Sequence, residues 1–118
     1  MKEFKNHTFV VCAYKESRYL SECIESLKNQ TVKSNIIITT STPNNYIKEI
    51  AKKNNIKLYV NDGESGIGQD WNFGVSKTNT DYVTIAHQDD MYCKNYLEEI
   101  VEELNKNKDF IIAFGNYR

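Results

Sequence analysis

The sequence has little of several features that would place it in a special class of protein. It has a single proline and five glycines in 118 residues, which leaves no linker or low-complexity stretch. Its three cysteines are odd in number and contain no CxxC pair, so they indicate neither a disulfide framework nor a zinc site. No apolar run approaches the roughly 20 residues that cross a bilayer. These absences predict one compact domain over residues 1–118 with reduced thiols.

An excess of one charge is also missing. Fifteen Lys and Arg residues stand against 16 Asp and Glu residues, and a formal net charge of −1 gives no basic stripe for nucleic acid. The polar start, Met1 to Thr8, runs into an apolar segment too short for a signal peptide. We therefore expect a cytoplasmic protein without a transmembrane segment, and we expect His7, in the polar start, to be exposed.

What the chain does have is a regular alternation of strand and helix patterns. Short apolar runs rich in β-branched residues predict five strands, at residues 9–13, 35–40, 57–60, 81–86 and 110–114. Helical spacing of apolar residues predicts helices at residues 19–27, 46–51, 71–75 and 96–104. Ser17 is expected to cap the first helix, and Thr42-Pro43 to begin the second.

This alternation predicts βαβ units, a parallel sheet and helices on both of its faces. Right-handed crossovers then place every loop that follows a strand at one edge of the sheet. Ligands bind at that edge in open α/β proteins. We therefore expect the loops that hold Tyr14, Gly66 and Asp89 to meet in one cleft.

Two adjacent carboxylates, Asp89 and Asp90, follow the predicted fourth strand. Carboxylates in this position repel each other, and a hard divalent cation such as Mg²⁺ or Mn²⁺ would relieve the repulsion. Capping of the next helix is an equally good explanation from the spacing alone. His87 just before them could be a metal ligand or a phosphate donor, but a packed histidine satisfied by the backbone is favoured.

Other candidate residues have similar alternatives. The loop Gly63-x-x-Gly66-x-Gly68 could cradle a phosphate through its backbone, although a plain turn is the better default. Tyr14 could stack on a nucleobase or only cover the sheet edge. Trp71 and Phe73 are expected to be packing residues.

These segments together resemble the N-terminal half of family 2 glycosyltransferases, a large inverting group with the GT-A fold. The resemblance runs from Phe9 to about Tyr117 and is carried by the order of four segments: 9–16, 19–31, 66–74 and 84–92. It implies a Rossmann-like, three-layer α/β/α domain with a mainly parallel central sheet. The last segment, Thr84 to Tyr92, falls where the family has its Asp-x-Asp motif.

The resemblance also implies roles for individual residues toward a nucleotide-diphosphate sugar. Asp89 would bind a divalent metal, Mn or Mg, that bridges the diphosphate. The other residues implied to contact the donor are Ala13, Tyr14 and Glu16 at the base and ribose, Gly66 and Asn72 on the sugar-phosphate side, and Asp90 beside the metal.

The chain departs from the family pattern in three respects. His87 replaces the first aspartate of the Asp-x-Asp motif, and Thr39-Thr40-Ser41-Thr42 replaces an Asp-Asp-Gly-Ser stretch after the second strand. The family's catalytic base belongs to the second half of the domain, so we expect this chain alone to lack one. The predicted strand 110–114 would leave apolar surface uncovered, from which we expect self-association.

The leading hypothesis is therefore the donor-binding part of an inverting glycosyltransferase, with the sugar, the base and the acceptor left open. A non-catalytic module that binds a nucleotide or a protein partner on the same fold is the alternative. A receiver-type signalling domain ranks third, because Tyr14-Lys15-Glu16 stands where such a domain needs its acidic pair.

Overall fold

The computed structural model describes residues 2–63, 67–88 and 91–106. Within these ranges, strands and helices alternate as the sequence predicts. The strands are β1 (Lys2–Ala13), β2 (Val32–Thr40), β3 (Lys57–Val60) and β4 (Tyr82–His87). The helices are α1 (Leu20–Lys28), α2 (Asn45–Lys53), α3 (Ile67–Ser76) and α4 (Tyr96–Lys106). The predicted strand 110–114 and the apolar surface inferred from it lie outside the described residues.

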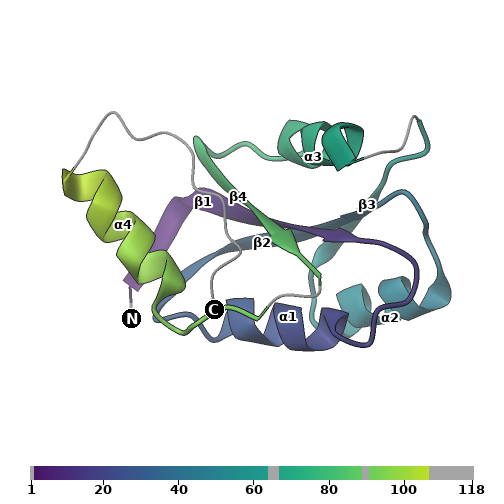
Figure 1. Ribbon diagram of the computed structural model, residues 1–118, viewed down its shortest axis with the longest axis horizontal. Coiled ribbons are helices and arrows are strands. Elements are labelled where there is room, and N and C mark those ends of the chain that lie inside the picture. The colour runs from purple at the N-terminus through teal and green to yellow at the C-terminus, as the bar shows by residue number, and fades with distance from the viewer. Residues whose placement is uncertain (1, 64–66, 89–90, 107–118) are drawn as a thin grey trace.

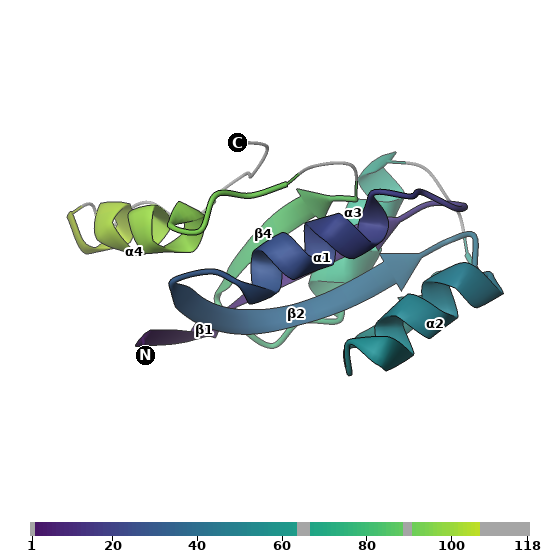
Figure 2. The ribbon, with the colours of Figure 1, turned by 90° about the horizontal axis from the view of Figure 1, so that it is seen from below.

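The described strands form one parallel sheet in the order β3-β2-β1-β4. Helix α3 covers one face of this sheet, and α1 and α2 cover the other (Figure 1). Seen from below, α1 and α2 lie over the strands, and α4 lies to their left (Figure 2). The chain therefore has the predicted three-layer α/β/α architecture with a parallel central sheet.

Strand β1 lies at the centre of the sheet and contributes side chains to both faces. Phe9, Val10 and Val11 are each 0% exposed, as expected for a strand that is covered by helices on both sides. Phe9 and Val11 belong to the main core cluster, whereas Val10 lies next to Gly74 of α3 on the other face. This alternation is the period of two that a strand imposes on its side chains.

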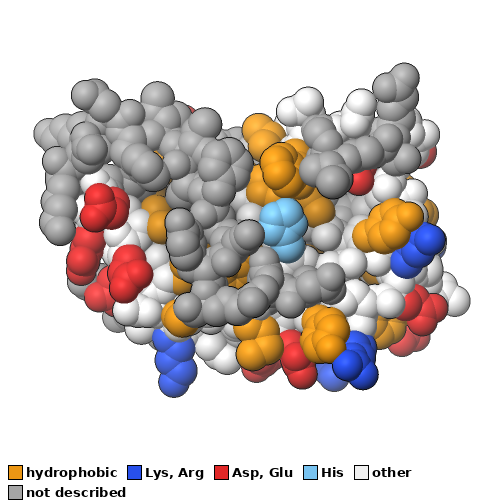
Figure 3. Space-filling view, viewed as in Figure 1, with side chains coloured by type: hydrophobic (Ala, Val, Ile, Leu, Met, Phe, Trp, Pro, Cys, Tyr) orange, Lys and Arg blue, Asp and Glu red, His pale blue; other side chains and the backbone are white. Residues whose placement is uncertain are grey.

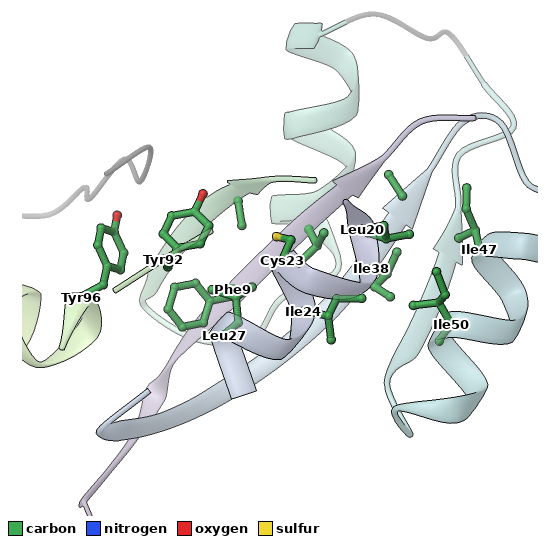
Figure 4. Close-up of a cluster of buried hydrophobic side chains, with 14 of the residues drawn as sticks. Phe9, Leu20, Cys23, Ile24, Leu27, Ile38, Ile47, Ile50, Tyr92 and Tyr96 are labelled. Carbon is green, nitrogen blue, oxygen red and sulfur yellow. The ribbon is translucent and has the colours of Figure 1, made fainter. Parts of the chain in front are cut away.

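The main core lies between the sheet and the helices α1, α2 and α4. Figure 4 shows Leu20, Cys23, Ile24 and Leu27 of α1 pointing toward the strands. Tyr92 and Tyr96 close the α4 end of this core, with ring centroids 5.0 Å apart. The buried face of α1 matches the predicted helical stripe, and β3 has the predicted bounds.

The polar start of the chain is a strand, which the sequence analysis missed. Residues Lys2, Glu3 and Phe4 pair with the beginning of β2, and the register shifts between Phe4 and Thr8. The prediction of an exposed His7 is therefore wrong, since its side chain is 1% exposed. Strand pairing carries this histidine into the interior, although its sequence neighbours are polar.

Hydrogen bonds explain how His7 is accommodated. Its Nδ1 atom lies 2.6 Å from Ser34 Oγ and its Nε2 atom 2.7 Å from Thr84 Oγ1. Ser34 Oγ donates to the His7 carbonyl, so it accepts from the ring and Nδ1 carries the proton. Burial lowers the pKa of His7 to about 4.

Two predicted helix caps are wrong. Tyr19, and not Ser17, precedes α1 as the N-cap residue, while the Ser17 carbonyl accepts from the Leu20 amide at 3.2 Å. In α2 the cap is Asn44, whose Oδ1 accepts from the Ile47 amide at 2.8 Å. Asn caps a helix as well as Thr does, which leaves Thr42 available for another contact.

No helix in the described part of the chain is long and apolar enough to cross a membrane.

Candidate functional site

The sheet has a topological switch point between β1 and β4. From β1 the chain continues to β2 and β3 on one side, and it then returns to place β4 on the other side of β1. The two strands run parallel and end together, with Cys12 opposite His87. The loops after such neighbouring strands diverge, and open α/β proteins bind ligands in the space outside them. The loops that follow Ala13 and His87 are therefore the candidate site.

The side chain of Gln88 joins these two loops. The Tyr14 amide donates to Gln88 Oε1 at 3.0 Å, and Gln88 Nε2 donates to the Tyr14 carbonyl at 3.0 Å. The two contacts together fix the orientation of the Gln88 side-chain amide, because its oxygen must face the Tyr14 N–H and its nitrogen must face the Tyr14 carbonyl. The bridge continues the β1–β4 pairing beyond the ends of both strands.

The loop after β2 holds the next residue from the opposite side. The Lys15 amide donates to Thr42 Oγ1 at 2.6 Å, and Asn44 Nδ2 donates to the Lys15 carbonyl at 3.0 Å. Lys15 has a φ of 54°, a left-handed conformation that is uncommon for a residue with a side chain. The surrounding contacts thus maintain a backbone conformation that is unfavourable by itself.

The predicted base-binding residues on this loop occupy different environments. Tyr14 is 52% exposed, and the Lys15 ammonium lies 5.1 Å from the centre of its ring. Glu16 is also exposed. Ala13 is buried in the main core, so any contact of Ala13 with a ligand would come through its backbone.

Helix α3 borders the same edge of the sheet. The rings of Trp71 and His87 lie 5.9 Å apart, and Asn72 beside Trp71 is exposed. Figure 3 shows a histidine side chain, in pale blue, exposed on the face toward the viewer with hydrophobic side chains next to it. Trp71 and Phe73 are predicted to be packing residues, and both side chains are half-buried.

The sequence favours a packed His87 whose ring is hydrogen-bonded by the backbone. In the structure this side chain is exposed instead. It is the backbone of His87 that is held. Its amide donates to the Tyr92 hydroxyl at 3.3 Å, and its carbonyl accepts from the Cys23 thiol at 3.3 Å. The end of β4 is therefore fixed to the core, while the imidazole is exposed beside Trp71 of α3.

The half-buried Asp70 carboxylate lies between α3 and the ends of the strands. Asp70 Oδ1 accepts from Asn61 Nδ2 at 3.3 Å, and the Asn61 amide donates to the Thr40 carbonyl at 2.8 Å. Burial raises the pKa of the Cys12 thiol, and the Asp70 carboxylate adds to the rise, while a hydrogen bond from Thr39 opposes it. The first turn of α3 is thus hydrogen-bonded, through Asn61, to the carboxyl ends of β3 and β2.

Sequence reasoning did not single out Asn44, Asp70 and Gln88 at this edge, and it named Thr42 only as a helix start and as a departure from the family pattern. Each contacts a residue from another segment, so no local pattern identifies it. The predicted metal ligand Asp89, its neighbour Asp90 and the loop residue Gly66 lie outside the described residues. Within residues 2–63, 67–88 and 91–106, no group of three or more His, Cys, Asp or Glu side chains could hold a metal ion.

Bacterial proteins with similar sequences are named glycosyltransferases. The chain is 28% identical over 114 residues to the glycosyltransferase GlyG of Streptococcus pneumoniae, covering 92% of this chain and 38% of that protein. It is 32% identical over 114 residues to an uncharacterized glycosyltransferase of Haemophilus influenzae, with coverage of 92% and 35%. The chain therefore spans little more than a third of the length of these relatives.

A similar fold occurs in a solved structure. Residues 1–349 of TarS from Staphylococcus aureus superpose with a TM-score of 0.72 at 20% sequence identity, covering 92% of this chain and 33% of that one. In sequence, residues 8–118 match the family model described as glycosyl transferase family 2. A match over nearly the whole chain shows that this protein belongs to glycosyl transferase family 2.

Proposed function

We propose that this chain forms the nucleotide-sugar-binding part of an inverting glycosyltransferase. The donor lies at the carboxyl edge of the sheet, between the loops that follow β1 and β4. Tyr14 stacks on the nucleobase, and Glu16 and Asn72 flank the donor on either side. The complete protein transfers the sugar to an acceptor that contacts other parts of it.

The observation that supports this proposal best is the bridge between Tyr14 and Gln88. It brings the loop with the exposed aromatic ring next to the end of β4, immediately before the carboxylate pair. An aromatic face suits a base, and a strand end that leads into carboxylates suits a metal-bound diphosphate. In the proposed site the aromatic ring would serve the base, and the carboxylates would serve the diphosphate.

A divalent cation fits the donor set that follows Gln88. Asp89 and Asp90 supply only carboxylate oxygens, which are the ligands that Mg²⁺ and Mn²⁺ prefer together with substrate phosphates. Asp89 would hold the ion, with Asp90 beside it. When bound, the ion would neutralise the charge that develops on the leaving diphosphate. His87 comes two residues before Asp89 in the chain, and its exposed imidazole could donate a hydrogen bond to a phosphate oxygen.

Calorimetry with nucleoside diphosphates, with and without Mn²⁺, tests this function. We expect binding that requires the metal, loss of that binding in Asp89→Ala, and weaker but still metal-dependent binding in Tyr14→Ala. Thr78→Val, which removes a hydroxyl that donates to the Val75 carbonyl, is a control that should bind normally. Equal binding by wild type and Asp89→Ala would favour a helix cap and a non-catalytic module.

A further inference from the structure

Four backbone groups of the dipeptide Tyr14-Lys15 are hydrogen-bonded by side chains from two other loops. On the β4 side, the Gln88 amide contacts both the N–H and the carbonyl of Tyr14. On the β2 side, Thr42 accepts from the Lys15 N–H and Asn44 donates to the Lys15 carbonyl. We name Gln88, Thr42 and Asn44 the polar clamp.

The residues of the polar clamp on the β2 side are themselves fixed. The Thr42 amide donates to Thr40 Oγ1 at 3.0 Å, and Thr40 is 3% exposed. Asn44 caps α2 through its Oδ1 while its Nδ2 reaches Lys15. The clamp therefore fixes the position of the exposed loop relative to β2 and α2, which are rigid parts of the fold.

The conformation that the clamp holds is unfavourable in isolation. The left-handed conformation brings the Cβ atom of Lys15 too close to the following carbonyl oxygen, so Lys15 would leave this region of backbone space if its partners were removed. Tyr14, its neighbour, is 52% exposed and has little packing of its own to fix it. The backbone therefore decides where this side chain starts and which rotamers are open to it.

We propose that Gln88, Thr42 and Asn44 are positioning residues of the donor site, which hold Tyr14 in the orientation that binds a nucleotide. The proposal rests on the proposed function. A ligand that stacks on Tyr14 binds more tightly when this ring is already in place, because ordering the loop costs free energy at the moment of binding. Loss of one clamp hydrogen bond should weaken nucleotide binding although none of the three residues needs to touch the nucleotide.

The chain offers matched variants for the test. Thr42→Val removes the hydroxyl that accepts from Lys15, and Thr42→Ser keeps it. Asn44→Asp retains an oxygen to cap α2 but has no N–H to donate to Lys15, and Asp and Asn are comparable caps. Gln88→Met keeps the length of the side chain without its amide.

Two measurements on these proteins separate the clamp from the proposed function. The first is amide hydrogen exchange without ligand, in which the Tyr14 and Lys15 N–H groups should be protected although both residues are exposed. Protection of Tyr14 should be lost in Gln88→Met, and that of Lys15 in Thr42→Val but not in Thr42→Ser. Rapid exchange of both amides in the wild type would overturn the proposal, whatever the protein binds.

The second measurement is the Kd for a nucleoside diphosphate in the presence of Mn²⁺. One hydrogen bond corresponds to a Kd about 2- to 10-fold weaker, so we expect this loss in Gln88→Met, Thr42→Val and Asn44→Asp, with recovery in Thr42→Ser. The melting temperature of these variants should fall by a few degrees at most, as expected for one hydrogen bond, whereas a general folding defect would lower it further. Unchanged Kd values in variants that have lost amide protection would overturn the clamp and leave the proposed function intact. Protected amides in a wild type that binds no nucleotide would overturn both, because the clamp would then position no ligand.

Discussion

Gly74 of α3 lies so close to Val10 of β1 that a Cβ atom on the glycine would stand 2.5 Å from Val10 Cγ1. Val10 is 0% exposed and cannot move away without disturbing the centre of the sheet. The close approach of backbone to side chain at this point sets how tightly α3 packs on the strands.

We therefore expect Gly74→Ala to lower the free energy of unfolding by about 1–3 kcal/mol, as overpacking of a core does. Denaturant titration of the wild type and the variant measures this difference. Val10→Ala would make room for the new methyl group, so the double variant should lose less stability than the sum of the two single variants. Strictly additive losses would show that the two residues do not compete for the same space.

The buried His7 makes stability depend on pH. Its pKa is about 4 in the folded protein and 6.5 for an ordinary histidine, so the unfolded chain binds the extra proton between these values. The free energy of unfolding should therefore fall as the pH decreases from about 6.5 to about 4, by an amount on the order of 3 kcal/mol from this residue.

Urea titrations at several pH values, on the wild type and on His7→Gln, isolate this contribution. The other titrating groups are common to both proteins, so the difference between the two curves reports His7. The difference should shrink steadily over this acidic range and stay constant above about pH 7. A pH-independent difference would contradict a buried, neutral imidazole.

The backbone conformation of Lys15 gives a prediction on stability alone. A β-branched residue is especially unfavourable at a φ of 54°, whereas glycine adopts it freely. Lys15→Val should therefore be less stable than Lys15→Gly by about 1–2 kcal/mol, as measured by thermal or chemical unfolding. Equal stability of these two variants would mean that the residue is not held in the left-handed region.

The three thiols should differ in reactivity. Cys93 is exposed, Cys12 is half-buried with a raised pKa, and Cys23 is buried and donates to the His87 carbonyl. Because the thiolate is the reactive form, an alkylating reagent at neutral pH should modify Cys93 first, Cys12 much later and Cys23 only upon unfolding. Mass spectrometry of peptides from a time course gives the order, and early modification of Cys12 would contradict its environment.

The sequence predicts the layers of this fold better than it predicts the contacts of the site. The strand at residues 57–60, the strand predicted at 81–86 and observed at 82–87, and the stripe of α1 follow from periodicity, which is a local property. The first half of β1 escapes this reasoning because its polar residues are stabilised by pairing with β2, on which the local pattern carries no information.

The same limit applies to the polar residues around Tyr14. Thr42 and Asn44 both have side chains suited to a helix cap, and only the tertiary structure decides that Thr42 contacts Lys15 and Asn44 begins α2. Gln88 and Tyr14 are 74 positions apart in the chain, so their bridge depends on the order of the strands. The carboxylates Asp89 and Asp90 and the aromatic residue Tyr14 are predicted site residues because their chemistry is evident from the sequence without a partner.

The central claim, that a nucleotide binds between the loops after β1 and β4, is tested most directly by NMR titration. A nucleoside diphosphate added with Mg²⁺ to the isotope-labelled chain should shift the amide signals of Tyr14, Lys15 and Gln88 in a saturable manner. The signals of His7 and Ser34, at the opposite end of the sheet, should not move. Saturable shifts at His7 and Ser34 with none at Tyr14 and Gln88, or no shifts at all, would contradict the assignment of the site.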